Sequence, residues 1–187
     1  MTQIFAGVRV VELAQYVFVP ASSTLLADHG AEVIKIEPPI TGDPYRTLKV
    51  GDGRETAKAN MAMEQNNRGK KSVAIDLKNE EGREILLRLI DTADVFITSL
   101  RPLALRGLRL EPEDLMARNP RLIYARGNGL GFKGAEFNKA GYDASAFWAR
   151  GGFAALLTAP DADVPTRPRP ALGDHSSAIS LLAGITS

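Results

Sequence analysis

Short β-branched runs that alternate with helical segments predict an α/β fold for this chain, in which a Rossmann-like parallel sheet carries helices on both faces. Strand and helix follow one another several times, with no sequence repeat and no low-complexity tract between them. This order requires crossover connections, which produce parallel strands and place the helices against the sheet. We therefore expect the 187 residues to lie within one such domain.

Five segments have the composition of strands. One of them alternates apolar and charged residues with a period of two, as a half-buried strand does, and the others are short apolar runs rich in β-branched residues. The expected strands are residues 8–13 (VRVVEL), 31–37 (AEVIKIE), 72–76 (SVAID), 94–98 (DVFIT) and 121–126 (RLIYAR).

Helical segments lie between and after these strands. Residues 20–29 (PASSTLLADH) begin with a proline, which suits the first turn of a helix, and Gly30 is a stop signal. Residues 79–93 carry the strongest helical pattern, because their apolar residues Ile85, Leu86, Leu89, Ile90 and Ala93 share one face. Further helices are expected at residues 111–119, 144–150 and 176–185.

Two long segments show neither the period of a strand nor that of a helix. Residues 38–71 contain proline, glycine and charge, and they end in the basic run NNRGKKS, which is typical of a solvated surface. Residues 158–170 (TAPDADVPTRPRP) lead the chain to Asp174. Loops of this length are usually functional or disordered, and open sheets bind their ligands in loops at the carboxyl ends of parallel strands.

The composition excludes several classes of protein. With 44% hydrophobic and 24% charged residues the chain is typical of a soluble protein, and its net charge of +1 gives no general attraction to nucleic acid or membranes. No apolar run reaches the ~18 residues of a membrane span and the N-terminus lacks a signal-peptide pattern, so we expect a cytoplasmic protein. Cysteine is absent and His29 and His175 stand in unlike contexts, so we expect no metal site.

Gly129, Gly131 and Gly134 form a GxGxxG pattern directly after the last expected strand. A dinucleotide site would require a helix to begin at these glycines, with an acidic residue near the end of the next strand. The polar residues AEFNKAGYD follow instead, and the first strand lacks the pattern. We therefore expect the glycines to allow tight turns beside a ligand, and a nucleotide-binding redox protein is the weakest functional alternative.

Asp174 is the most informative residue of the chain. It follows a glycine and precedes the expected helix 176–185 in the segment ALGDHSSA. Such a carboxylate is commonly an N-cap, which accepts hydrogen bonds from the first free backbone N–H groups of a helix. It can also be a nucleophile whose rotamer those N–H groups fix. The local sequence alone favours the N-cap.

Five motifs follow one another along the chain: GVRVVELAQYVFVPASSTLLADHGAEVIKIEPPITGDPYR, NNRGKKSVAIDLKNEEGREILLRLIDTADVFI, NPRLIYARGNGLG, AGYD and ALGDHSSAISLLAGI. Together they resemble the class III CoA-transferases, the superfamily of formyl-CoA transferase, carnitine CoA-transferase and α-methylacyl-CoA racemase. The resemblance covers essentially the whole chain. It implies that residues 1–187 are the N-terminal portion of a Rossmann-like large domain, without the small domain, and that the full-length form is an interlocked homodimer.

The resemblance implies that Asp174, in the motif LGDHS, is the catalytic nucleophile. In these transferases a carboxylate attacks the acyl-CoA thioester to give a mixed anhydride, and the released CoA thiolate returns to give an aspartyl-CoA thioester. An incoming acid takes the CoA by the reverse steps, which divides a difficult exchange into covalent stages. The implied substrates are an acyl-CoA and a carboxylic acid, with no permanently bound cofactor. A helix N-terminus favours the ionised carboxylate that this chemistry needs.

Tyr142 and Asp143, in the motif AGYD, are implied to line the acyl site by hydrogen bonds. Racemases of the superfamily carry histidine where this chain has Tyr142, and a phenol is a poor general base at neutral pH, so the tyrosine favours transfer over racemisation. The structural alternative is a buried tyrosine followed by an aspartate that caps helix 144–150. The run AFWARGGF resembles the transferases for 2-hydroxy or aryl acids.

The segments after three expected strands are implied to contact CoA. Val17 stands where some transferases have a glutamine, whose polar role is here vacant or filled elsewhere. Arg101, Arg106 and the Lys70–Lys71 pair are candidates for the CoA phosphates, although Arg106 lies one position from the arginine of several relatives. The implied residues are Val17, Phe18, Ile75, Asp76, Leu77, Lys78, Ser99, Leu100, Arg101 and Arg106.

The sequence thus predicts a CoA-transferase that moves CoA from an acyl-CoA to a carboxylic acid. Members of the superfamily are longer than this chain, so we expect a fragment or a truncated gene product. An acyl-CoA racemase is the alternative activity. A non-catalytic subunit or a truncated remnant of a transferase is the alternative role.

Overall fold

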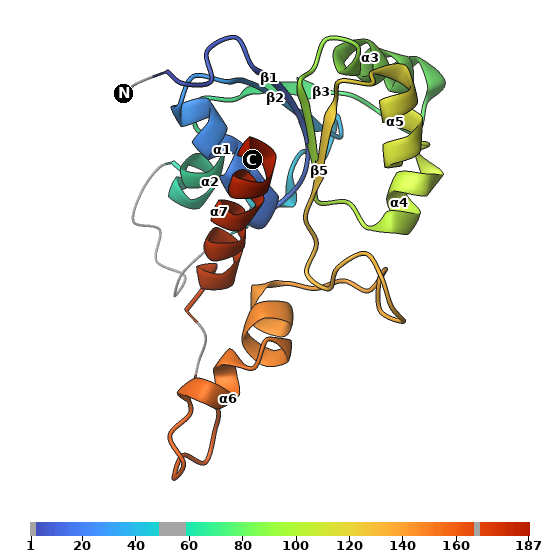
Figure 1. The fold of residues 1–187 in the computed structure, drawn as a ribbon. Helices are drawn as coiled ribbons and strands as arrows, with labels where there is room; N and C mark the ends of the chain where they lie inside the picture. Colours follow the sequence, from blue (N-terminus) through green and yellow to red (C-terminus); the bar gives the residue numbers. More distant parts are fainter. Residues whose placement is uncertain (1–2, 49–58, 167–168) are drawn as a thin grey trace.

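Five parallel strands form a single sheet in the order β3-β2-β1-β4-β5 in the computed structural model, which describes residues 3–48, 59–166 and 169–187 (Figure 1). This order is that of a Rossmann-like half, so the predicted fold class is confirmed. The strands are β1 (Arg9–Leu13), β2 (Glu32–Glu37), β3 (Lys71–Ala74), β4 (Val95–Thr98) and β5 (Ile123–Arg126).

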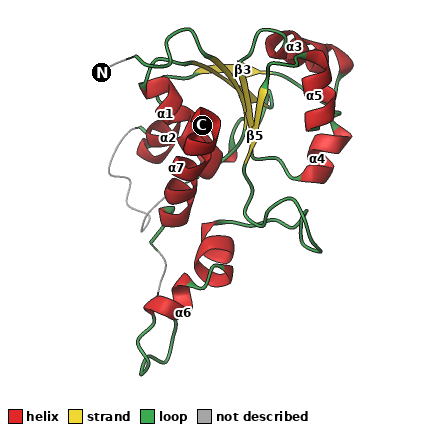
Figure 2. Ribbon diagram, viewed as in Figure 1, coloured by secondary structure: helices red, strands yellow, loops and turns green. Residues whose placement is uncertain are grey.

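Helices cover both faces of the sheet (Figure 2). On one side lie α1 (Phe18–Asp28), α2 (Met61–Asn67) and α7 (Leu172–Thr186), and α7 packs along α1. On the other side lie α3 (Glu80–Ile90), α4 (Pro102–Gly107) and α5 (Pro112–Arg118). The 3₁₀ turn η1 (Pro44–Arg46) follows β2, and the π-helix η2 (Asp143–Arg150) and α6 (Phe153–Leu157) form an arm below the sheet.

The core has two halves because neighbouring residues of a strand point to opposite faces of the sheet. Val10 and Val11 are both fully buried, and they belong to different hydrophobic clusters. Val11 packs in the cluster that contains Leu86 of α3, whereas Val10 packs in the cluster that contains Leu26 of α1 and Ile185 of α7. The sheet is therefore buried on both sides, which fixes the positions of α1 and α7 beside the ends of the strands.

Several elements differ from the sequence expectations. Helix α1 begins at Phe18, two residues before Pro20, and β3 is shifted to Lys71–Ala74. The segment 38–71, expected to be irregular, contains η1 and α2, while its residues 49–58 lie outside the described part. Helix α4 was not expected, and α7 begins at Leu172, four residues before the predicted start.

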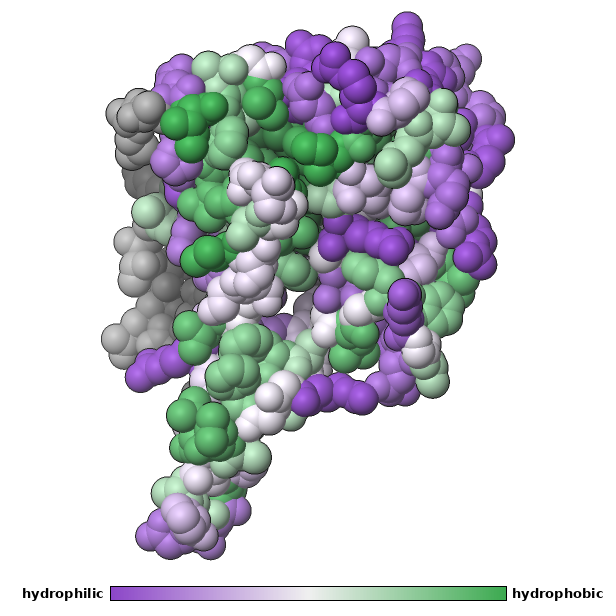
Figure 3. Space-filling model, viewed as in Figure 1, coloured by the Kyte–Doolittle hydropathy of each residue, from purple (hydrophilic) through white to green (hydrophobic). Residues whose placement is uncertain are grey.

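Apolar side chains gather on the surface of the arm and along part of α7 (Figure 3). They include Leu156 and Leu157 of α6 and Ile179 of α7, all of them exposed. None of the helices in the described ranges is both long and apolar enough to cross a membrane.

Candidate active site

A cleft of about 580 Å³ lies at the carboxyl ends of β1, β4 and β5. Its floor comes from the residues that directly follow those strands, and its walls are η2 and the first turns of α1 and α7. Crevices at this edge of a parallel sheet are the usual ligand sites of such folds. The cleft contains Asp174, Tyr142, Asp143, Val17, Phe18, Ser99, Leu100 and Arg101 among its lining residues.

Asp174 lies in the first turn of α7 rather than at its N-cap, which corrects the N-cap prediction. The N-cap is Ala171, which has a φ of 60° and no side chain that could accept a hydrogen bond. The Asp174 carboxylate is therefore free of a capping role, although it still lies near the positive end of the helix.

Asp143 of η2 supplies the cap that α7 lacks. Its Oδ1 atom accepts a hydrogen bond from the backbone N–H of Asp174 at 3.1 Å. Gly173 allows this approach, because a Cβ atom at that position would lie 2.5 Å from the same Oδ1 and 2.2 Å from Cγ of Phe147. The structural alternative, in which Asp143 caps its own helix, is wrong, since η2 begins with Tyr142 at its N-cap.

The electrostatic environment raises the pKa of Asp174 to about 6. Partial burial in the cleft is the main cause, and the negative charge of Asp143 adds to it. The helix N-terminus was expected to favour the ionised carboxylate, whereas desolvation and the charge of Asp143 both favour its protonated form. At pH 7, about one unit above this pKa, roughly nine-tenths of the carboxyl groups are still ionised, so a nucleophile is available at neutral pH.

Two tyrosines form an aromatic wall of the cleft. Tyr16 has a φ of 65°, a conformation uncommon for a bulky residue, and its backbone N–H donates to Oδ1 of the buried Asp43 at 3.1 Å. Its ring meets the ring of Tyr142 edge to face, with centroids 5.6 Å apart. Tyr142 is 59% exposed, so the alternative of a buried tyrosine is wrong.

The first and third groups of predicted CoA contacts line the cleft. Val17 and Phe18 lie at the start of α1, and Ser99, Leu100 and Arg101 lie at the end of β4. Ser99 Oγ accepts a hydrogen bond from the backbone N–H of Gln15 at 3.0 Å, which joins the two segments. Arg101 is exposed at the cleft, and its Nη1 atom donates to the carbonyl of Asn138 at 3.1 Å.

The second group does not line the cleft. Ile75 is buried in the core cluster with Leu86, and Leu77 packs against that cluster. Asp76 accepts a hydrogen bond from the backbone N–H of Lys78 at 3.0 Å in a turn. Their predicted contact with CoA stays a prediction.

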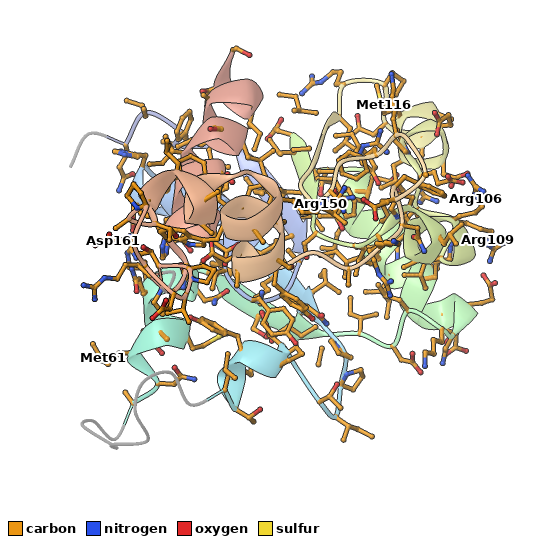
Figure 4. All side chains as sticks on the ribbon, turned by 90° about the horizontal axis from the view of Figure 1, so that it is seen from below. Met61, Arg106, Arg109, Met116, Arg150 and Asp161 are labelled. Atoms are coloured by element: carbon orange, nitrogen blue, oxygen red, sulfur yellow. The ribbon has the colours of Figure 1, made fainter. Side chains whose placement is uncertain are left out.

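Arg106 also lies away from the cleft, on the outer side of α4 (Figure 4). Its guanidinium pairs with the Glu111 carboxylate at 3.2 Å. Arg106 thus forms an ion pair with a nearby surface residue, and its predicted contact with a CoA phosphate stays a prediction.

Lys70 is buried in an ion-pair network and does not face a phosphate site, which corrects the expectation for the basic run. Its ammonium group lies 2.7 Å from Oε2 of Glu12, whose Oε1 lies 2.7 Å from Nζ of Lys35. Lys35 also pairs with Asp43 at 2.9 Å. Lys71, in contrast, is exposed and pairs with Glu32 at 2.6 Å.

Some polar residues of the cleft were not singled out from the sequence, among them Gln15 and Asn128. Gln15 lines the cleft two residues before Val17, and it is the amide nearest in sequence to the vacant glutamine position. Asn128 follows β5, and its buried Nδ2 atom has no hydrogen-bond partner among the described residues. Their position directly after strands was a usable signal, because ligand-binding side chains of open sheets concentrate there.

The glycine-rich loop after β5 begins no helix at its glycines, as expected. Gly129 lines the cleft and packs against Gly141, where an added Cβ would lie 2.7 Å from the Gly141 carbonyl oxygen. Gly131 and Gly134 have φ values of 78° and 84°, which a residue with a side chain rarely adopts. Among the described residues no cluster of three or more metal-ligating side chains is present.

The model of CoA-transferase family III matches residues 5–187. The cinnamoyl-CoA:phenyllactate CoA-transferase of Clostridium sporogenes is 39% identical over 98% of this chain and 44% of its own length. The (R)-2-hydroxy-4-methylpentanoate CoA-transferase of Clostridioides difficile is 37% identical over 95% of this chain and 44% of its own length.

Among solved structures, a CaiB/BaiF family protein from Brucella suis superposes with a TM-score of 0.88 at 34% identity. The match covers 100% of this chain and 49% of that protein. The chain thus spans about half the length of the relatives it matches.

Proposed function

This chain belongs to CoA-transferase family III, and we propose that the protein carrying it moves CoA from an acyl-CoA to a free carboxylic acid through an aspartyl-CoA thioester on Asp174. The observation that carries the proposal is the placement of Asp174. A half-buried carboxylate on the first turn of a helix faces a cleft at the carboxyl ends of the strands. The acyl donor, the acceptor and the covalent route are parts of the proposal.

In the first half of the reaction, the Asp174 carboxylate attacks the thioester carbonyl of the donor. The carbon–sulfur bond breaks, and CoA leaves as a thiolate from a mixed anhydride. The thiolate then attacks the Asp174 carbonyl of this anhydride, which forms the aspartyl-CoA thioester and releases the donor acid as a carboxylate. No net proton is consumed, because carboxylates and thiolates exchange at each step.

The second half reverses these steps with a new acid. The acceptor carboxylate attacks the aspartyl thioester, which gives a second mixed anhydride and a CoA thiolate. The thiolate attacks the acceptor's acyl carbon, so the acceptor leaves as its CoA thioester and Asp174 returns to a carboxylate. The raised pKa of Asp174, about 6, supports this role, because a more basic carboxylate is a stronger nucleophile while it remains mostly ionised at neutral pH.

The cleft supports distinct positions for the two parts of the donor. Val17, Phe18, Ser99 and Leu100 would contact the CoA chain, and the exposed guanidinium of Arg101 would meet a phosphate. The acyl group would then reach Asp174 between η2 and α7. Contacts to CoA from Ile75–Lys78 and from Arg106 would require an extended ligand that leaves the cleft.

The walls near Asp174 favour an apolar or aromatic 2-hydroxy acid as the acceptor. Tyr16, Tyr142 and Phe147 line the cleft, and the Phe147 ring stacks on Phe153 with centroids 4.3 Å apart. Such rings bury the side chain of an aryl or branched acid at little entropic cost. Phenyllactate and 2-hydroxy-4-methylpentanoate, in the names of the two relatives, are acids of this class. A cytoplasmic homodimer remains the expected assembly.

The test replaces the nucleophile without changing its shape. We expect Asp174→Asn to lower the rate of CoA transfer by a factor of at least ~10⁴, because a neutral amide cannot form the anhydride. The wild type and the variant are assayed with acetyl-, butyryl- and succinyl-CoA against a panel of 2-hydroxy and aryl acids, with the new thioester identified by mass spectrometry.

The matched control is Asp161→Asn, which makes the same chemical change on an exposed residue of the arm, away from the cleft (Figure 4). It should transfer CoA at the wild-type rate. Turnover by Asp174→Asn near that of the control would refute the proposal. Deuterium incorporation at the α-carbon of an acyl-CoA in heavy water, without transfer to any acid, would instead favour the racemase.

A further inference from the structure

The first turn of α7 is held from two directions by successive residues. The backbone N–H of Asp174 donates to Asp143 of η2 at 3.1 Å, and the Nε2 atom of His175 lies 3.0 Å from Oδ1 of Asn66 in α2. The backbone N–H of Asp174 is one of the free donors of the first turn and points along the helix axis, whereas the side chain of His175 extends outward from the axis. One contact therefore ties the turn to the cleft wall, and the other ties it to the body of the fold.

The direction of the hydrogen bond between His175 and Asn66 follows from the other contacts of the amide. Asn66 is 1% exposed, and its Nδ2 atom donates to the carbonyl of Ala62 at 3.0 Å. Its Oδ1 atom is thus the acceptor for His175, and the imidazole carries a proton on Nε2. A side-chain amide that is buried and bonded at both ends has a fixed orientation.

Asn66 is in turn anchored to buried polar side chains. Its backbone carbonyl accepts from Nζ of Lys70 at 2.8 Å and from Oγ1 of Thr24 at 2.5 Å. Lys70 is paired with the fully buried Glu12 of β1. A displacement of Asn66 would therefore break hydrogen bonds to buried donors, one of them the ammonium group of an ion pair, which is costly.

Helix α7 has no cap of its own at this end. Ala171 at the N-cap has no side-chain acceptor, and helix termini without partners fray. Asp143 supplies the missing cap for the backbone N–H of Asp174, and Asn66 holds the same turn through the side chain of His175. Of these two partners, Asn66 is buried in the core, whereas Asp143 is partly exposed in the wall of the cleft.

We propose that His175 is a positioning residue, which donates Nε2–H to the buried Asn66 amide and thereby holds the first turn of α7 so that Asp174 faces the cleft. The inference rests on the proposed function in one respect only, namely that Asp174 reacts. The imidazole does not line the cleft, so it acts through the backbone of the turn and not on the substrate.

The test compares removal of the hydrogen bond with its conservative replacement. We expect His175→Ala to lower kcat by about 10- to 100-fold with KM changed less than about threefold, because the reacting carboxylate loses its alignment while the CoA contacts remain. His175→Gln, whose amide nitrogen can reach the same acceptor, should restore kcat to within about threefold of the wild type.

Two controls separate positioning from general damage. Ser180→Ala changes a surface residue of the same helix, whose hydroxyl donates to the Ser176 carbonyl, and should leave kcat and thermal stability unchanged. Asn66→Ala should lower kcat as His175→Ala does, and the double variant should be no slower than the slower single variant, since both remove one interaction.

A second readout does not depend on turnover. Carbon-13 NMR titration measures the pKa of the Asp174 carboxyl group directly. We expect this pKa to fall by about half a unit or more in His175→Ala, because the loosened turn exposes the carboxyl group to water. In His175→Gln the pKa should return to the wild-type value. An unchanged titration in His175→Ala, or a loss of kcat that follows thermal stability and that glutamine does not restore, would overturn the proposal. If the wild type transfers no CoA, the proposed function fails, and the titration still decides the role of His175.

Discussion

The chemistry proposed for Asp174 depends on a pKa that leaves its carboxylate ionised at neutral pH and also makes it a good nucleophile. A carboxylate with an ordinary pKa is ionised but weakly nucleophilic, whereas one with a strongly raised pKa would be protonated at neutral pH. The cleft raises the pKa of Asp174 to about 6, chiefly by desolvation and secondly through the charge of Asp143. The carboxylate form is therefore both available and more basic than usual at pH 7.

This pKa predicts the pH dependence of the reaction. The rate should rise with pH through about 6 as Asp174 loses its proton, and then level off. Asp143→Asn keeps the oxygen that accepts from the Asp174 N–H but removes the negative charge, so the pKa of Asp174 falls. We expect the rising limb of kcat/KM for the acyl-CoA to move to lower pH by about half a unit.

The measurement is a pair of pH–rate profiles with the same donor and acceptor, so that titration of the substrates cancels in the comparison. A limb that stays in place, or that moves to higher pH, would show that the charge of Asp143 does not control the nucleophile. Complete loss of activity in Asp143→Asn would show that its carboxylate has a direct role in the reaction.

At the scale of elements, the site depends on the close contact between α7 and η2. Gly173 lies where these two elements touch, and a Cβ atom there would be 2.2 Å from the Phe147 ring and 2.5 Å from the Asp143 carboxylate. Neither neighbour is free to withdraw, because the Phe147 ring stacks on Phe153 and Asp143 holds the N–H of Asp174. The glycine is thus required by packing and not by backbone conformation.

Gly173→Ala should therefore displace the first turn of α7 and reduce both stability and transfer. Overpacking of this kind costs about 1–3 kcal/mol of unfolding free energy. Gly184→Ala is the matched control, since it lies in the same helix with no atom within 4 Å of the added Cβ. This control should stabilise the protein by about 0.5–1 kcal/mol through helix propensity. Thermal or denaturant unfolding of both variants provides the measurement, and equal effects of the two substitutions would contradict the packing argument.

The elements that the sequence predicted well are those stabilised by a local apolar pattern. The strands β1, β2 and β4 and the helix α3 coincide with their predicted segments to within a few residues, because each buries a regular set of side chains. Helix α2 has no such pattern. Only Met63 and Asn66 of α2 are buried, and Asn60 caps it by accepting from the Met63 N–H at 3.0 Å.

At the scale of the whole molecule, the sequence located the cleft but not the contacts that shape it. Strand ends and the resemblance together identified Asp174, Tyr142, Asp143 and the segments around Val17 and Ser99. The hydrogen bond from Asp174 to Asp143 spans 31 residues, and no local pattern encodes it.

The position of Lys70 was missed for the same reason. In sequence it belongs to a basic run, which usually lies in solvent. In the fold its ammonium group is buried with Glu12, 58 residues away in sequence, and with backbone carbonyls of α1 and α2. Because of this tertiary pairing, Lys70 joins β1, α1 and α2 and is not exposed as a phosphate ligand.

The central claim is that Asp174 carries CoA between the two acids, and a trapped intermediate tests it most directly. The protein is incubated with an acyl-CoA in the absence of an acceptor, treated with hydroxylamine, digested and analysed by mass spectrometry. Hydroxylamine attacks an aspartyl thioester or anhydride and leaves a hydroxamate on the side chain. We predict a hydroxamate on Asp174 that requires the acyl-CoA and is absent from Asp174→Asn. A hydroxamate found only on another residue, or no modification in a preparation that transfers CoA, would contradict the account.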